Sequence, residues 1–221
     1  MKEDIKLEFC LLTNPKYQEI RDRHYVENHG CHGQQIHFLI WYKEEVVGII
    51  SGASSVYAVK DRDNFFEIPK DKLLKQKFYL SAIINNTVFR LELHEKNLAT
   101  CILAKWRKLM IELWEQLYQV PVIGFETFVV ETDTRKGCLY LADNWTYVGK
   151  TAGSTKVHCG LKNKHTRIAT DAKLIYCIKN PKAVFPPIVE YKSSWKAETP
   201  EEKNRALRLK NLRANLIGKK F

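Results

Sequence analysis

Apolar residues recur along the chain at two spacings, which predict several strands and one long helix. Runs rich in β-forming residues predict strands at residues 7–12, 36–42, 46–51, 82–93, 120–130, 146–151 and 173–178. Apolar side chains three and four residues apart predict a helix over residues 98–118, with Asn97 as its cap. Shorter helices are predicted at 16–28, at 137–145 and from Pro200 onward, while residues 57–80 follow no regular pattern.

The order of these elements predicts an α/β (α+β) domain with a mixed sheet and helices on both faces. Lys43–Glu45 is predicted to form a tight turn between the second and third strands, which indicates an antiparallel hairpin. The strand at 120–130 is apolar on both faces, which favours a central position in the sheet. Because the composition shifts near Lys192, we expect a globular domain over residues 1–190 and a basic helix or tail over 191–221.

Composition and charge narrow the partners of this domain. Its 45% hydrophobic residues suffice for a core, and 36 Lys and Arg against 25 Asp and Glu give a formal net charge of +11. That excess favours a polyanion, and double-stranded DNA is the expected partner. The N-terminus is charged and the chain has no apolar run of about 20 residues, so no membrane partner is predicted. Its six cysteines include no Cys-x-x-Cys pair, which predicts reduced thiols and a cytoplasmic protein. The sequence leaves a homodimer open.

Several segments, in order, resemble the Mom family of phage DNA adenine-modification proteins and the Mom-like proteins of Druantia-type anti-phage defence systems. These segments are Asn86–Leu91, Lys96–Thr100, Phe125–Phe128 and Tyr140–Thr151, together with Arg23–Tyr25 and Asp61–Asp63, which look closer to the Druantia group. The last long segment also looks like the closing part of the GNAT acyltransferase superfamily. The matching segments span about residues 20–156 and leave out the basic tail.

The resemblance implies a GNAT-like, mostly antiparallel sheet and a transferase that adds a carbamoylmethyl- or acyl-type group to the exocyclic amine of adenine in DNA. The alternative is a non-catalytic DNA-binding subunit of a defence system. GNAT enzymes hold coenzyme A pyrophosphate on a Gly-rich turn at a helix N-terminus. Here that junction, residues 93–99, has no glycine and carries Glu95, whose charge repels a phosphate. Ordinary acetyl-CoA use is therefore not expected, and the donor is not identified.

Two charged residues on predicted strands are candidates for the chemistry. Arg90 stands among apolar neighbours, and its guanidinium suits a phosphate or carboxylate; the alternative is an exposed arginine or a pair with Glu92. Glu126 interrupts an apolar strand and needs a partner or a raised pKa. It either handles protons or forms a structural ion pair with Arg90 or Lys150.

Four further candidates lie together at 140–145. We expect Asp143 to share in handling protons, and Tyr140, Asn144 and Trp145 to grip an extruded adenine. In a helix Tyr140 and Asn144 share a face, Asn reads the adenine edge, and an aromatic ring stacks on the base. The alternative is a core aromatic pair with an asparagine that caps the helix.

The remaining candidates bind substrate or phosphate. The resemblance implies that His24 and Tyr25 line the active cleft, and the polar positions Asn86 and Thr127 on predicted strands are counted with them. Phosphate contacts are predicted in a Gly-containing stretch, at Lys150, Thr151 and Lys156, and in the tail helix, at Arg205, Arg208 and Arg213. The alternative for the tail is a solvated basic helix or a disordered segment. The cluster of His29, Cys31 and His32 matches no closed zinc spacing, so no metal is predicted.

Overall fold

The computed structural model describes residues 4–25, 33–56, 59–68, 80–158, 165–183 and 199–221. Its centre is a seven-stranded sheet in the order β1-β2-β3-β4-β5-β9-β6. The strands are β1 (Ile5–Cys10), β2 (Gln35–Tyr42), β3 (Glu45–Ser54), β4 (Ile83–Leu91), β5 (Gly124–Val130), β6 (Thr146–Lys150) and β9 (Lys173–Lys179). Among the pairs of described strands in this sheet, β4–β5 is parallel and the others are antiparallel. Strands β7 (Ser154–His158) and β8 (His165–Ala169) form a separate hairpin that the sequence pattern did not predict.

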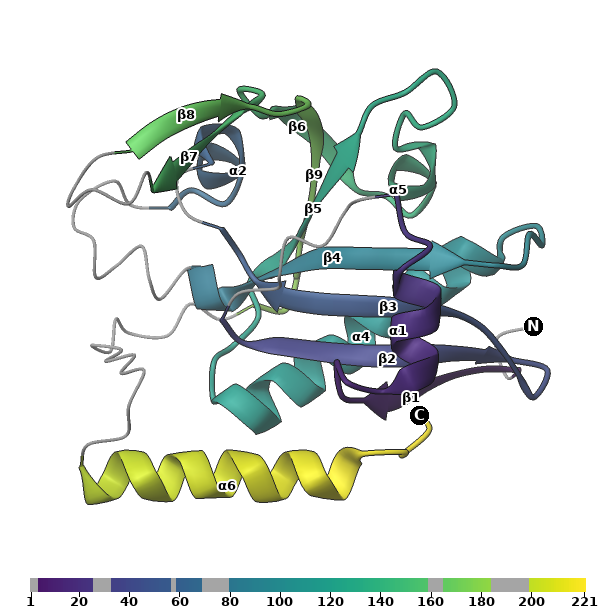
Figure 1. The fold of residues 1–221 in the computed structure, drawn as a ribbon, viewed down its shortest axis with the longest axis vertical. Helices are drawn as coiled ribbons and strands as arrows, with labels where there is room; N and C mark the ends of the chain where they lie inside the picture. The colour runs from purple at the N-terminus through teal and green to yellow at the C-terminus, as the bar shows by residue number, and fades with distance from the viewer. Residues whose placement is uncertain (1–3, 26–32, 57–58, 69–79, 159–164, 184–198) are drawn as a thin grey trace.

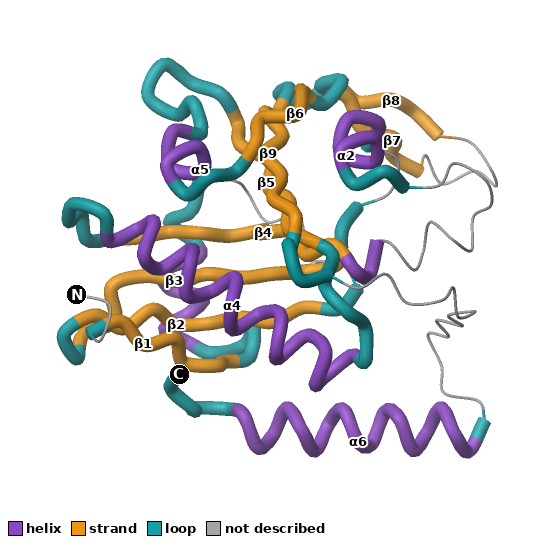
Figure 2. The backbone as a smooth tube through the Cα atoms, turned by 180° about the vertical axis from the view of Figure 1, so that it is seen from behind, coloured by secondary structure: helices purple, strands orange, loops and turns teal. Residues whose placement is uncertain are grey.

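Helices cover both faces of the sheet, which confirms the predicted fold class. α1 (Pro15–Arg21) lies across β2, β3 and β4 on one face, and α4 (Leu98–Tyr118) lies on the other (Figures 1 and 2). The shorter helices are α2 (Lys60–Phe65) and α5 (Cys138–Ala142), and α6 (Pro200–Leu216) runs beside the C-terminal end of α4. The sheet is therefore mixed, mostly antiparallel and enclosed between two layers of helices.

The main core lies between α4 and the sheet. Trp106 and Met110 on α4 are fully buried, and they meet the sheet at Gly52 on β3. A Cβ at Gly52 would lie 2.5 Å from the methyl carbon of Met110 and 2.7 Å from a methyl carbon of Ile84. The glycine thus lets α4 pack closely against β3 and β4, which holds both strands in place for the site described below.

Three local predictions were wrong. α1 ends at Arg21 rather than continuing to residue 28, although its predicted Asn14-Pro15 start is right: Asn14 accepts hydrogen bonds from the N–H groups of Lys16 and Tyr17. Asn97 precedes α4 in a left-handed conformation (φ 64°) and its side chain makes no capping hydrogen bond. The stretch 57–80, predicted to be irregular, contains α2, because buried Arg62 draws that turn against the sheet.

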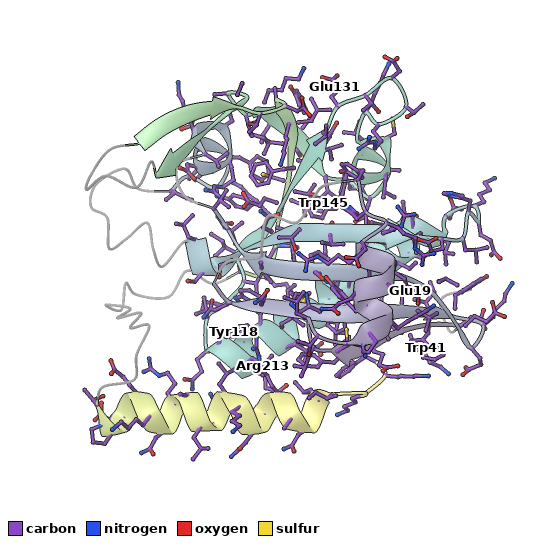
Figure 3. All side chains as sticks on the ribbon, in the orientation of Figure 1. Glu19, Trp41, Tyr118, Glu131, Trp145 and Arg213 are labelled. Carbon is purple, nitrogen blue, oxygen red and sulfur yellow. The ribbon has the colours of Figure 1, made fainter. Side chains whose placement is uncertain are left out.

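The C-terminal segment packs against the domain. Arg213 on α6 donates hydrogen bonds to the Gln35 carbonyl (2.6 Å) and to the Tyr118 hydroxyl (2.5 Å), and Figure 3 shows Arg213 beside Tyr118. Residues 218–221 then run antiparallel to β1, where the Leu7 N–H donates to the Phe221 carbonyl and the Phe221 N–H returns the bond, both at 3.1 Å. Main-chain pairing therefore fastens this segment to the edge of the sheet.

A buried polar triad joins α1 to the sheet. The Ser51 hydroxyl lies 2.9 Å from His37 Nδ1 and 2.5 Å from the Tyr17 hydroxyl. Burial and, to a smaller extent, the positive charges of Arg21 and Arg213 together lower the pKa of His37 to about 4. The imidazole is therefore neutral in the folded protein at neutral pH.

This histidine predicts acid sensitivity. Because the folded-state pKa lies below the ordinary value of about 6.5, the neutral imidazole contributes stability that is complete above pH 6.5 and is lost as the pH falls towards 4. We expect the free energy of unfolding to drop by about 3 kcal/mol over that window through His37 alone. Urea denaturation at pH 7 and pH 4.5 measures the loss. The His37→Asn variant should lose distinctly less, and an equal loss in both proteins would contradict the assignment.

Candidate active site

The candidate site lies where two central strands part. β4 and β5 are paired only at Ile83–Asn85 with Gly124–Glu126, after which β5 turns away from β4 (Figures 1 and 2). Asn86 and Thr127 are the first residues beyond the paired part, and the Thr127 hydroxyl donates to the Asn86 carbonyl at 3.1 Å. The place where the two strands part is called the opening below, and ligands commonly bind at the ends of parallel strands.

A bulge in β4 decides which side chains reach this opening. Asn86 is paired with Gly52 and Val88 with Ser51, so Thr87 is an extra residue in the strand. Asn86, like Ile84 two residues before it, faces α4 and α5, whereas the extra residue moves Val88 to the face covered by α1. Arg90, farther along the strand, instead hydrogen-bonds the Arg23 carbonyl beyond α1, on the other face.

Three polar side chains meet at the opening. The Tyr140 hydroxyl donates to Asn86 Oδ1 at 2.9 Å and lies 3.4 Å from the Thr127 hydroxyl. The Asn86 amide donates to the carbonyls of Ser51 (3.0 Å) and Val88 (3.3 Å), which fixes its oxygen towards Tyr140. Burial raises the pKa of Tyr140, so its phenol stays protonated at neutral pH. It can therefore donate a proton or hydrogen bond but cannot act as a base.

Tyr25 approaches this cluster from the side of α1. Tyr25 is 44% exposed, and its electrostatic effect adds to burial in raising the pKa of the Tyr140 phenol. The His24 ring lies 4.5 Å from the Tyr25 ring, and the central guanidinium carbon of Arg135 lies 3.8 Å from the Tyr25 ring centre. Tyr25 thus forms an accessible aromatic wall beside the buried phenol of Tyr140.

Asp143 and Trp145 hold α5 in place. Arg107 on α4 donates to both oxygens of Asp143, at 3.1 Å and 2.9 Å, and the Trp145 indole donates to the same carboxylate at 2.9 Å. Trp145 is only 2% exposed and packs edge-on against Tyr140, so stacking on a base would require its ring to leave the core. Both oxygens of Asp143 are therefore engaged in structural contacts.

The predicted shared face of Tyr140 and Asn144 was wrong. α5 ends at Ala142, and Asn144 follows it in a left-handed conformation (φ 64°) with an exposed side chain. Tyr140 is buried on the opposite side, against Tyr176 and Trp145. Asn144 therefore serves the turn that ends the helix, because asparagine tolerates the left-handed region better than most residues.

Glu126 faces away from this cluster. Successive side chains on β5 alternate between faces, so Thr127 points towards α5 and Glu126 towards α2. There Arg62 Nη1 donates to Glu126 Oε2 at 2.6 Å, and both side chains are fully buried. Burial raises the pKa of Glu126, while the charge of Arg62 opposes the rise. The predicted structural pair exists, but its partner is Arg62.

The two partners expected for Glu126 are engaged elsewhere. Arg90 Nε pairs with Glu92 at 2.5 Å, the alternative that the sequence left open, and Lys150 pairs with Glu131 at 2.5 Å. Arg90 also donates to the Arg23 carbonyl, so it fastens the chain that leads from α1 to Tyr25. The structure thus gives Arg90 a positioning contact beside the opening.

Comparison with known proteins identifies the family. The model of the family described as Druantia protein DruA matches residues 3–177. The chain belongs to the DruA family. Of the two groups that the sequence resembles, the match is therefore to the Druantia group, and the likeness to the Mom family stays a prediction. No curated protein sequence matches the DruA-family chain.

Solved structures with a similar course of the chain include three acetyltransferases. One, from Bacillus subtilis in complex with CoA, is 8% identical, with 80% of this chain and 99% of that chain covered and a TM-score of 0.48. Campylobacter jejuni N-acetyltransferase PseH is 14% identical (80% and 98% covered, TM-score 0.41). A GNAT family acetyltransferase from Elizabethkingia anophelis with acetyl-CoA bound is 11% identical (80% and 99% covered, TM-score 0.42). Likeness at this level supports no conclusion about function.

The residues predicted to contact DNA lie in two places on the DruA-family chain. Arg205 is exposed on α6, whereas Arg208 donates to the Gln116 carbonyl (3.1 Å) and Arg213 is turned inward as described above. Thr151 accepts from the Lys173 N–H at 2.9 Å, which ties it to β9. The side chain of Lys156 lies outside the described residues. Of the side chains in this set that the structure describes, Arg205 is exposed and has no hydrogen bond or ion pair within the described residues.

The segment before α4, where GNAT enzymes bind the coenzyme A pyrophosphate, carries a negative charge in this protein. Glu95, before α4, accepts from the Tyr42 hydroxyl at 2.7 Å and pairs with Lys43 at 3.5 Å, so its charge remains near the helix N-terminus. Within the described ranges no cluster of His, Cys, Asp and Glu could hold a metal ion, and His29, Cys31 and His32 lie outside them. None of the described helices combines the length and apolar character needed to span a bilayer.

The sequence reasoning missed three arginines. Arg62 and Arg107 bind the two carboxylates that were expected to handle protons, and Arg135 lies over Tyr25. Arg62 carried a signal, since it lies in the Asp61–Asp63 segment of the family resemblance. No signal in the sequence marked Arg107 or Arg135, because an arginine in a helix or loop is predicted to be solvated unless its neighbours in space are known.

Proposed function

We propose that this protein is a DNA-modifying transferase that adds a small acyl- or carbamoylmethyl-type group to the exocyclic amine of adenine. The observation that carries the proposal is the protonated Tyr140 hydroxyl, held at the divergence of β4 and β5 beside the exposed Tyr25 ring. Membership of a defence-system family and a net charge of +11 support DNA as the substrate.

The chemistry assigns distinct roles to the two tyrosines. When the amine nitrogen forms its bond to the group, it releases a proton to water, and the bond between the group and its carrier breaks. The departing carrier atom needs a proton, and the residue that donates it regains one from water. Tyr140 supplies that proton, because burial keeps its phenol protonated and Asn86 orients it. An amine inside a stacked duplex cannot meet a donor, so the adenine is extruded towards the opening, where Tyr25 forms the wall.

The carboxylates have structural roles in this proposal. Glu126 is paired with Arg62 on the far face of β5, and Asp143 is held by Arg107 and Trp145. This engagement also favours the second candidate function, a DNA-binding subunit of a defence system that performs no transfer. The two functions differ in whether DNA from expressing cells contains an altered nucleoside.

Mass spectrometry of nucleosides from cells expressing the protein separates the two functions. Under the transferase proposal, the digest contains a heavier adenosine-type nucleoside whose mass increment identifies the added group. The matched control is Tyr140→Phe, which should lose that peak. An unaltered profile from folded, DNA-binding protein, expressed beside the other proteins of its natural system so that the donor is present, would reject the transferase and favour the binding subunit.

A further inference from the structure

Arg135 brings an unsatisfied positive group to the mouth of the proposed site. Its Nη1 atom is buried and has no hydrogen-bond partner within the described part of the chain. The rest of the guanidinium lies over the exposed Tyr25 ring, with its central carbon 3.8 Å from the ring centre. A guanidinium N–H withdrawn from water and left without an acceptor is costly, which points to an acceptor that comes with a ligand.

The backbone around Arg135 is held firmly. Thr132 and Arg135 exchange two main-chain hydrogen bonds (3.1 and 3.2 Å), and the Arg135 N–H also reaches the Thr132 hydroxyl at 3.0 Å. The Tyr176 hydroxyl donates to the Lys136 carbonyl at 2.6 Å, and Gly137 admits the Tyr176 ring because a Cβ there would lie 2.3 Å from it. The guanidinium is thus carried on a turn that is fixed to β9, so little conformational entropy of the backbone is lost when a ligand binds.

The carboxylates near this turn leave Arg135 uncompensated. Glu131 is paired with Lys150 and Asp143 with Arg107. Asp133 is exposed and makes no ion pair with Arg135 among the residues that the structure describes. The mouth of the site therefore keeps a net positive charge on a planar fork, a geometry that matches the oxygens of a phosphodiester.

We propose that Arg135 binds the backbone phosphodiester next to the extruded adenine. The inference rests on the proposed function, since it assigns the same opening to DNA. A nucleotide whose base enters beside Tyr25 carries its phosphate at the mouth, where the Nη1 donor gains the acceptor that it lacks. The contact reads no base, so it contributes affinity and position for the target nucleotide at any sequence.

The test measures the salt dependence of DNA binding. A fluorescent duplex of about 20 base pairs is titrated at several salt concentrations with wild-type protein, Arg135→Gln, Arg135→Lys and Lys108→Gln. The last variant removes one positive charge at an exposed position of α4 and is the matched control. Each phosphate contact contributes about 0.9 to the slope of log affinity against log salt. Thermal unfolding of each variant confirms that it folds.

We expect Arg135→Gln to reduce the slope by about 0.9 and the affinity at low salt by about tenfold. Arg135→Lys should keep the slope, because it keeps the charge, and Lys108→Gln should match wild type. A slope for Arg135→Gln equal to that of Lys108→Gln would overturn the proposal, as would a wild-type protein that does not bind the duplex. The two proposals fail in different ways. If only the transferase function is wrong, the nucleoside profile is unaltered while Arg135→Gln still reduces the slope of DNA binding.

Discussion

Replacing Glu126 with alanine is expected to lower the free energy of unfolding by about 3–5 kcal/mol. Glu126 and Arg62 are both fully buried, and the ion pair between them is 2.6 Å long. Among the described residues, the substitution leaves the buried Arg62 guanidinium with Asp63 and the Val56 carbonyl as acceptors. Removing one partner of a buried pair costs more than the pair itself contributes, because the other charge stays desolvated.

Urea denaturation at pH 7 measures this loss. Glu19→Ala on the exposed face of α1 removes a carboxylate from a surface pair and should cost less than about 0.5 kcal/mol. Replacing both partners, with Arg62→Met and Glu126→Leu together, should recover much of the stability because no buried charge remains. If Glu126→Ala is no more destabilised than Glu19→Ala, the buried pair is not present in solution.

Replacing Tyr140 with phenylalanine is expected to reduce adenine modification by about 100-fold or more. The substitution removes one hydroxyl, the proposed proton donor, and keeps the ring that packs against Tyr176 and Trp145. Loss of the hydrogen bond to Asn86 should cost only about 1 kcal/mol of stability. Activity should therefore fall far more than the folded population does.

The readout is the amount of modified adenosine in DNA from cells with equal levels of each protein. Tyr147→Phe is the matched control, since Tyr147 is 48% exposed on β6 and its hydroxyl is not part of the cluster at the opening. It should modify DNA as wild type does. Full modification by Tyr140→Phe would reject the proton-donor role while leaving the site itself open to other assignments.

The regular elements followed closely from the sequence where one face of an element is apolar. The observed bounds of α4, Leu98–Tyr118, are those predicted, because its apolar stripe matches the helical period throughout. The end of α1 and the left-handed Asn97 did not follow, since neighbouring segments rather than local preference determine them. The bulge at Thr87 is equally invisible in the sequence, yet it decides which β4 side chains face the opening.

The candidate site was predicted in part. Tyr140, Asn86 and Thr127 were named from the sequence and do meet. Asn86 and Thr127 are polar positions on buried strands, Tyr140 is a buried residue of α5, and buried polar groups are costly unless they are hydrogen-bonded. The partners of Glu126 and Asp143 were not predicted, since Arg62 and Arg107 lie 64 and 36 residues away along the chain. Sequence patterns report burial, whereas pairing over such separations depends on the packed fold.

The pairing of residues 218–221 with β1 has a consequence for association between molecules. A sheet edge with free main-chain groups recruits strands from other chains and leads to aggregation. Along β1 those groups are taken up by residues 218–221, in which Lys219 and Phe221 face β1 through their main chains and Lys220 faces outward. The new edge is thus a few residues long and charged. The Lys220 amine lies 3.3 Å from the Trp41 ring centre and covers an aromatic surface that could otherwise contact other molecules. A variant that ends at residue 217 should therefore remain folded but self-associate in concentrated solution.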